Sequence, residues 1–222
     1  MAALRRVSSK AVGEQKSAQP FDAVRHQSAL GATHREAERL EEAARSDYEP
    51  FLNFARASGQ RYKECLLLKW SDVDWDQRLI TTKGKGGRTI IIPITPSIAT
   101  ILWPLRGHHP ERVFTYIAQR PRGNRVKGQR YPLTVNGAKS QWRRTRAKAA
   151  IENFRFHDIR HDVGTKLLRE TGNLKLVQKA LNHADLKTTT RYAHVLDAEV
   201  AEALERVQKS RKKSRSSSRK VG

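Results

Sequence analysis

Cysteine is almost absent from this 222-residue sequence, since Cys65 is its single example. One cysteine excludes an intramolecular disulfide and any zinc site built from cysteine pairs, and it suits a reducing compartment. Long hydrophobic runs are also absent: no stretch approaches the roughly 20 apolar residues that a membrane-spanning helix needs. The first residues lack the apolar core of a secretory signal. These absences predict a protein of the cytoplasm without a membrane span.

Acidic side chains are scarce. The sequence has 22 Asp and Glu against 44 Lys and Arg, which gives a formal net charge of +22. Such an excess is the electrostatic footprint of a protein that binds a polyanion, and nucleic acid is the leading candidate. We therefore expect a partner such as double-stranded DNA and a location beside it, in association with the nucleoid.

The length suits one sizeable domain. Residues 1–32 show no sustained periodicity and are expected to be disordered. The domain itself is predicted over 33–208. Residues 209–222 form a basic tail interleaved with Ser, expected to be unfolded in isolation and attracted to phosphate, with Lys212 and Lys213 among its cations.

Apolar periodicity and capping signals predict a mainly α protein. Thr33 and Glu36 have the form of a capping box for a first helix. Ser58-Gly59 should end a second, and the next should carry Leu66, Leu67 and Leu68 toward the core. Further helices are expected over 96–105, 134–151, from 157 onward, and over 174–181, 186–192 and 197–208.

A change in composition after residue 72 predicts β-strands. Residues 73–75, 79–82 and 88–93 are rich in β-formers, and Gly84, Gly86 and Gly87 supply a turn between the last two. The expected class is α+β: mainly helical, with a small three-stranded antiparallel sheet. Residues 106–133 are rich in Gly, Pro, Arg and His and are expected to be one long irregular segment.

A group of reactive side chains lies near the C-terminal end of the predicted domain. His157 and Arg160 are three residues apart, so on a helix both project from one face. The chain then reverses between short amphipathic patterns, which can bring His183 and Tyr192 beside the first pair. A phenol, two imidazoles and a guanidinium are the groups that phosphoryl transfer to a tyrosine requires.

Several segments together resemble the tyrosine recombinases, the phage-integrase family. They are residues 59–64, 84–88 leading to Pro93, 157–161, 181–183 and 188–195, and the resemblance extends over roughly residues 33 to 207. It implies the catalytic-domain fold of that family. It also implies a DNA recombinase or integrase that forms a 3′-phosphotyrosine link without a metal or ATP.

The chemistry of the side chains fits the roles that the resemblance implies. Arg61 and Arg160 suit the phosphate oxygens, because guanidinium forks bind phosphate in a bidentate manner and keep their charge. Lys85, at the tip of the predicted hairpin, can protonate the leaving 5′-oxygen, and Lys83 competes for that role. Tyr192 is the expected nucleophile.

Other roles complete this expectation. Histidine is the residue type suited to managing protons near neutral pH, so His157 and His183 are expected to manage protons or orient the phosphate. Glu64, three residues after Arg61, is expected either to pair with a neighbouring group or to lie on a solvated face. Further DNA contacts are assigned to Lys83, Arg88, Arg143, Arg144, Lys212 and Lys213. No cofactor is expected, and a homo-oligomer, a tetramer in this family, should assemble on DNA through the final helix.

Three alternatives remain open on the sequence. A catalytically silent or truncated DNA-binding remnant could keep the fold, and a type IB topoisomerase-like enzyme would share the chemistry. His157 and His161, four residues apart, also resemble part of a zinc hydrolase motif. In addition, family members usually carry an N-terminal DNA-clamping domain, whereas only about 32 residues precede Thr33 here. A fragment, a catalytic-domain-only member and a remnant are all compatible with that departure.

Overall fold

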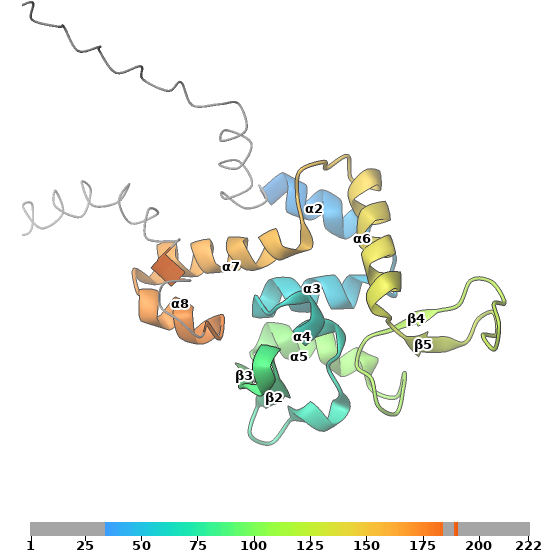
Figure 1. The fold of residues 1–222 in the computed structure, drawn as a ribbon, viewed down its shortest axis with the longest axis horizontal. Coiled ribbons are helices and arrows are strands. Elements are labelled where there is room, and N and C mark those ends of the chain that lie inside the picture. Colours follow the sequence, from blue (N-terminus) through green and yellow to red (C-terminus); the bar gives the residue numbers. More distant parts are fainter. Residues whose placement is uncertain (1–33, 184–188, 191–222) are drawn as a thin grey trace, which may run out of the picture.

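A computed structural model describes residues 34–183 and 189–190 of the chain. The predicted helix over 197–208, the predicted helix over 186–192 apart from residues 189–190, the N-terminal segment 1–32, the tail 209–222, Thr33 and Tyr192 lie outside these described residues. Element labels follow Figure 1, in which the first described helix is α2.

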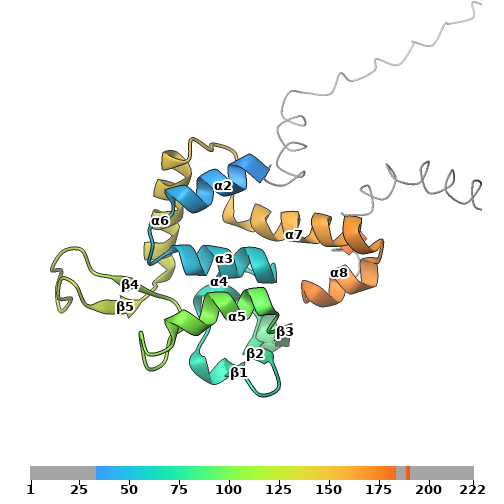
Figure 2. The same ribbon diagram turned by 180° about the vertical axis from the view of Figure 1, so that it is seen from behind.

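Helix α3 (Glu49–Ser58) lies at the centre of the described part. It packs against α2 (His34–Ala43), α4 (Tyr62–Leu66), α5 (Pro96–Leu102) and α7 (Phe156–Thr171). Both ribbon views show α3 between α7 and α5 (Figures 1 and 2). The exposed fractions of Phe51, Leu52 and Phe54 are all 0%, which identifies α3 as the buried helix around which the others are arranged.

An aromatic cluster explains why the start of α7 lies against α3. The Phe51 ring stacks on Phe156 with centroids 5.2 Å apart, and Tyr62 meets the edge of Phe156 at 5.0 Å. Aromatic pairs of this kind contribute beyond their buried area. The cluster therefore fixes the residues next to Arg61 and His157 relative to one another.

The predicted three-stranded sheet is confirmed. Strands β1 (Val73–Asp74), β2 (Leu79–Lys83) and β3 (Thr89–Pro93) are antiparallel in the order β1-β2-β3. In β3 the side chains of Ile90 and Ile92 are buried and that of Ile91 is exposed, as the alternation of a half-buried strand requires. A short 3₁₀ turn, Lys85–Gly87, connects β2 to β3.

The expectation of an irregular segment over 106–133 is wrong. Strands β4 (Thr115–Ile117) and β5 (Arg130–Pro132) pair antiparallel within it, with Tyr116 opposite Tyr131. Each strand is three residues long, too short for its alternation to stand out among Gly and Arg. The residues between them extend away from the helices as a long loop (Figure 1).

The remaining helices agree with the sequence, with shifted ends. Helix α6 (Val135–Lys148) begins after Thr134, whose hydroxyl accepts a hydrogen bond from the Gly137 amide. Helix α8 (Leu174–Ala180) packs on α7. The prediction that Leu67 faces the core is wrong, because its side chain is 46% exposed. Helix α4 ends at Leu66, so Leu67 leaves the helical face that points inward.

Candidate active site

Gly59 connects three distant segments of the chain. It ends α3 with a left-handed backbone (φ 63°), the conformation that glycine adopts most readily. A Cβ atom on Gly59 would lie 2.8 Å from Leu181 Cδ2 and 2.9 Å from Val163 Cγ1. The loop that leads to Arg61 therefore lies with its bare backbone against α7 and the end of α8.

Arg160 holds the same loop from α7. Its exposed fraction is 2%, and its Nη1 donates to the Gly59 carbonyl oxygen at 2.9 Å. Its Nη2 donates to the Leu181 carbonyl oxygen at the end of α8. A carbonyl carries no net charge, so these bonds orient the guanidinium without neutralising it.

Gln60 and Asn182 add a second connection beside Arg160. The Gln60 side-chain amide donates to the Ala180 carbonyl at 3.0 Å, and the Asn182 amide donates to Gln60 Oε1 at 3.4 Å. Sequence reasoning did not identify either residue as part of the site. The available signal was position alone, because Gln60 precedes Arg61 and Asn182 precedes His183.

Arg61 and Glu64 form the ion pair that was one of the two expectations for Glu64. The Arg61 Nη1 atom lies 3.1 Å from Glu64 Oε1, and Glu64 Oε2 accepts from the Arg61 backbone amide at 2.9 Å. The Glu64 side chain is 5% exposed and that of Arg61 is 31% exposed. The buried carboxylate therefore orients a guanidinium that can still be reached from solvent.

A pocket of about 180 Å³ opens beside this pair. Its lining includes Arg61 and Glu64, His183 and Asn182 from the end of α8, and Arg88 with its neighbours from the start of β3. Gly84 allows the close approach of the hairpin, because a Cβ there would lie 2.4 Å from Ile90 Cδ1 and 3.1 Å from Glu64 Oε1. Three segments far apart in sequence thus bring cationic and imidazole groups to one pocket.

The His183 ring is held by a buried hydroxyl. Its Nδ1 atom lies 2.9 Å from Thr189 Oγ1, and the exposed fraction of Thr189 is 0%. A bond at Nδ1 directs the Nε2 edge of the ring elsewhere. Thr189 is a further residue that sequence reasoning missed as a partner of His183.

His157 lies in the first turn of α7, one turn before Arg160, and is exposed. Its ring meets the edge of His161 with centroids 4.7 Å apart. His157 is not among the residues that line the small pocket. Asp158, next to it, is buried and accepts from the Arg155 amide at 2.7 Å, which caps the helix. The structure therefore brings Arg61, Arg88 and His183 to one pocket, and connects Arg160 to the loop that carries Arg61.

The remaining expected site residues have different environments. The Lys83 amino group donates to the Thr89 hydroxyl at 3.0 Å. Lys85 begins the 3₁₀ turn of the hairpin. Arg143 and Arg144 are exposed on α6. Tyr192, Lys212 and Lys213 lie outside the described residues.

No three His, Cys, Asp or Glu side chains within 34–183 and 189–190 come together as a metal site would require. The described residues thus give the zinc alternative no third ligand for His157 and His161. Within the same residues no helix is long and apolar enough to cross a membrane.

Known proteins resemble the chain in both sequence and fold. Tyrosine recombinase XerC of Chlamydia caviae is 31% identical over 140 residues, which are 63% of this chain and 44% of that protein. The integrase of Salmonella phage P22 is 26% identical over 168 residues, 72% of this chain and 42% of that protein. The chain thus spans less than half the length of these relatives.

Solved structures agree with the fold. The XerA recombinase structure matches with a TM-score of 0.60 at 24% identity, over 80% of this chain and 63% of that one. The catalytic domain of bacteriophage HP1 integrase matches with a TM-score of 0.57 at 20% identity, over 78% of this chain and 94% of that domain. A family model described as the phage integrase family matches residues 32–199. The chain belongs to the phage integrase family of tyrosine recombinases.

Proposed function

We propose that this chain cuts and rejoins DNA as a site-specific recombinase or integrase, through a 3′-phosphotyrosine intermediate. The observation that carries the proposal is the small pocket that gathers Arg61, Arg88 and His183, next to the loop held by Arg160. Solved neighbours include XerH recombinase bound to its difH substrate and a lambda integrase tetramer bound to a Holliday junction. Double-stranded DNA and a homo-oligomer, a tetramer assembled on DNA, are therefore the proposed partners, in the cytoplasm beside the nucleoid.

The first step forms one bond and breaks one. The Tyr192 oxygen attacks the phosphorus of a DNA phosphodiester, and the 5′-oxygen of the next nucleotide leaves. Negative charge develops on the non-bridging oxygens, where Arg61 and Arg160 stabilise it. An arginine oriented in advance stabilises this charge without rearrangement, and the Glu64 carboxylate and the Gly59 carbonyl provide that orientation.

Protons must also move. An ordinary phenol has a pKa of about 10, so Tyr192 has to lose its proton as it attacks. His157 and His183 are the groups proposed to manage protons and to orient the phosphate, and Lys85 is proposed to protonate the leaving 5′-oxygen. The reverse attack by a 5′-hydroxyl releases Tyr192 and rejoins the strand. The phosphotyrosine link keeps the energy of the broken bond, so the cycle is proposed to need no ATP. Cationic side chains supply the charge stabilisation, so it is proposed to need no metal.

A nicked duplex tests the nucleophile. Cleavage near a nick releases a short strand and traps the covalent protein–DNA adduct, which gel electrophoresis detects in the presence of EDTA and without ATP. We expect the adduct with the unaltered chain and none with Tyr192→Phe, which should still bind DNA. An adduct that survives in the Phe variant would assign the nucleophile elsewhere. Binding without any adduct in the unaltered chain would favour the silent remnant.

A DNA substrate with a sulfur leaving group tests whether Lys85 is the general acid. A substrate whose 5′-bridging oxygen is replaced by sulfur has a leaving group that needs no proton. We expect this substrate to restore cleavage by Lys85→Ala, measured as the rate of adduct formation. Lys83→Ala is the matched control from the same hairpin. Rescue of the control variant alone would transfer the role to Lys83.

A further inference from the structure

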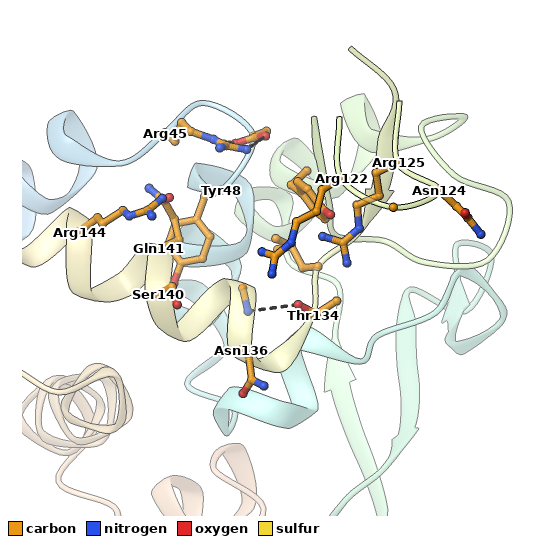
Figure 3. Close-up of a pocket in the computed structure, with 15 residues that line it drawn as sticks. Arg45, Tyr48, Arg122, Asn124, Arg125, Thr134, Asn136, Ser140, Gln141 and Arg144 are labelled. Carbon is orange, nitrogen blue, oxygen red and sulfur yellow. Dashed lines mark hydrogen bonds and ion pairs between the residues drawn. The ribbon is translucent and has the colours of Figure 1, made fainter. Parts of the chain in front are cut away.

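A second, larger pocket of about 1000 Å³ has no role in the proposed reaction. It is formed by the start of α6, the turn between α2 and α3, and the connection between β4 and β5 (Figure 3). Four arginines line it, Arg45, Arg122, Arg125 and Arg144, whereas Asp47 is the one carboxylate in the lining. Of these residues only Arg144 was expected to contact DNA.

Asp47 is already used within the protein. It accepts from Arg45 Nε at 2.6 Å and from the Ile117 amide at 2.7 Å. Burial disfavours the charged carboxylate, but these hydrogen bonds outweigh it and hold the pKa of Asp47 below its ordinary value. The carboxylate is thus ionised and paired with Arg45, which leaves the positive charge of the other three arginines unbalanced within the lining.

Arg122 and Arg125 face each other across a tight turn. The backbone amide of each donates to the carbonyl of the other, at 3.2 and 3.1 Å, and Gly123 makes the turn with a φ of 55°. Residues paired in this way project to the same side of a hairpin. Figure 3 shows the two guanidinium groups side by side and directed toward the start of α6. Like charges directly opposite each other destabilise a free hairpin, and a bound anion would reverse that cost.

Two tyrosines, Tyr48 and Tyr116, also line the pocket. The Arg125 guanidinium lies 5.6 Å from the centre of the Tyr116 ring. The hydroxyls of Tyr116 and Tyr48 are buried and have no hydrogen-bond partner within the described part of the chain.

One residue joins this pocket to the proposed active site. The Tyr62 hydroxyl donates to the Val135 carbonyl at 2.8 Å. Tyr62 follows Arg61, which lines the small pocket, and Val135 lies between Thr134 and Asn136, which line the large one. This hydrogen bond therefore connects the backbone beside one pocket to the backbone beside the other.

We propose that the large pocket binds a phosphodiester of the DNA duplex that flanks the cleaved bond, with Arg122 and Arg125 as its main contacts. The inference rests on the proposed function, because it takes DNA to be the ligand of the neighbouring pocket. Guanidinium forks match phosphate oxygens in geometry as well as charge. The flanking contact positions the duplex and takes no part in the chemistry.

The test is the salt dependence of binding to a duplex of random sequence, measured by fluorescence anisotropy on the full chain. Arg122→Ala/Arg125→Ala should weaken binding at low salt. It should also make the slope of log affinity against log salt shallower by about one for each phosphate that the variant no longer neutralises. Arg120→Ala/Lys127→Ala is the matched control, since it removes two exposed charges from the same loop outside the pocket lining. The control should change the slope less.

The outcomes separate the two proposals. An unaltered chain that binds no duplex overturns the proposed function itself. An unaltered chain that binds, with both double variants equally weakened, overturns the pocket alone. Thermal unfolding with inorganic phosphate or a nucleoside triphosphate distinguishes the source of the phosphate. Stabilisation of the unaltered chain by either one, absent in Arg122→Ala/Arg125→Ala while duplex binding is unaffected, would overturn DNA as the ligand.

Discussion

Arginines serve two different purposes in neighbouring parts of this molecule. Arg160, 2% exposed, donates to two backbone carbonyls, and Arg61 is paired with a buried carboxylate. Arg122 and Arg125 are exposed, lie on a loop and face each other. The first pair is fixed by the fold, whereas the second lies where a ligand can adjust it.

This difference corresponds to what each pocket is proposed to do. Stabilising a transition state requires charges oriented before the reaction, since reorganisation at that moment raises the barrier. Holding a flexible polymer requires charge, but tolerates side chains that settle after contact. Substitutions in the first region should therefore affect cleavage far more than binding, and those in the second should do the reverse.

The largest expected effect comes from the fixed arginines. Arg61→Ala and Arg160→Ala should each reduce the rate of covalent adduct formation by about 10²-fold or more, because each loses a charge oriented in advance. Arg169→Ala, exposed near the end of the same α7 helix, is the control and should cleave normally.

Arg160→Ala also removes the hydrogen bonds that Arg160 donates to two carbonyls, so the stability of the variant to unfolding is measured as well. Arg160→Lys retains the positive charge without the planar guanidinium. Its cleavage rate should lie between those of the unaltered chain and Arg160→Ala. Normal cleavage by a correctly folded Arg160→Ala would remove the distinction between the fixed and adjustable arginines.

An effect on stability should come from the backbone that supports Arg61. Gly59→Ala combines a left-handed backbone with a close contact to Leu181 and Val163, and should destabilise the fold by about 2–4 kcal/mol. Gly172→Ala is a matched control: its φ is 61°, and a Cβ there has no atom within 4 Å. It should cost only about 1–2 kcal/mol. Chemical denaturation measures both, and equal losses would mean that the close approach at Gly59 contributes nothing.

The smallest effect concerns the hydrogen bond from Tyr62 to Val135, which connects the two regions. Burial raises the pKa of Tyr62 to about 12 from its ordinary 10.0. Because the folded state favours the neutral hydroxyl, Tyr62 contributes its full stabilisation below about pH 10. That contribution is lost as the pH rises toward about 12. Tyr62→Phe should cost about 1 kcal/mol at neutral pH, because the hydrogen bond to Val135 is removed.

The difference in unfolding free energy between the unaltered chain and Tyr62→Phe isolates this group from the other tyrosines. That difference should shrink as the pH rises above 10. If the difference stays constant over this range, ionisation of Tyr62 does not contribute to the loss of stability at alkaline pH.

Local signals in the sequence predicted local structure well. Ser58-Gly59 ends α3 because glycine accepts the left-handed backbone, and the alternation in 88–93 matches β3. The Arg61–Glu64 pair could be predicted because residues three apart on a helix are neighbours. Each of these depends on residues close together in the chain.

Distant relations could not be predicted in the same way. No pattern in the sequence indicates that Arg160 bonds the carbonyl of Gly59, since backbone carbonyls are the same at every position. The β4–β5 hairpin was missed because its strands are three residues long and are separated by a long loop. Arg122 and Arg125 consequently resemble members of a charge-rich loop in the sequence rather than a facing pair.

The contact between Arg160 and Gly59 has a consequence for folding, because it joins residues separated by 101 positions, and the contact from Gln60 to Ala180 spans 120. Contacts of such long range form late, after the entropy of closing the loop has been overcome. A chain in which these two contacts have not formed lacks the hydrogen bonds that hold the loop of Arg61 against α7 and the end of α8. The proposed capacity to break DNA therefore arises only with the completed fold.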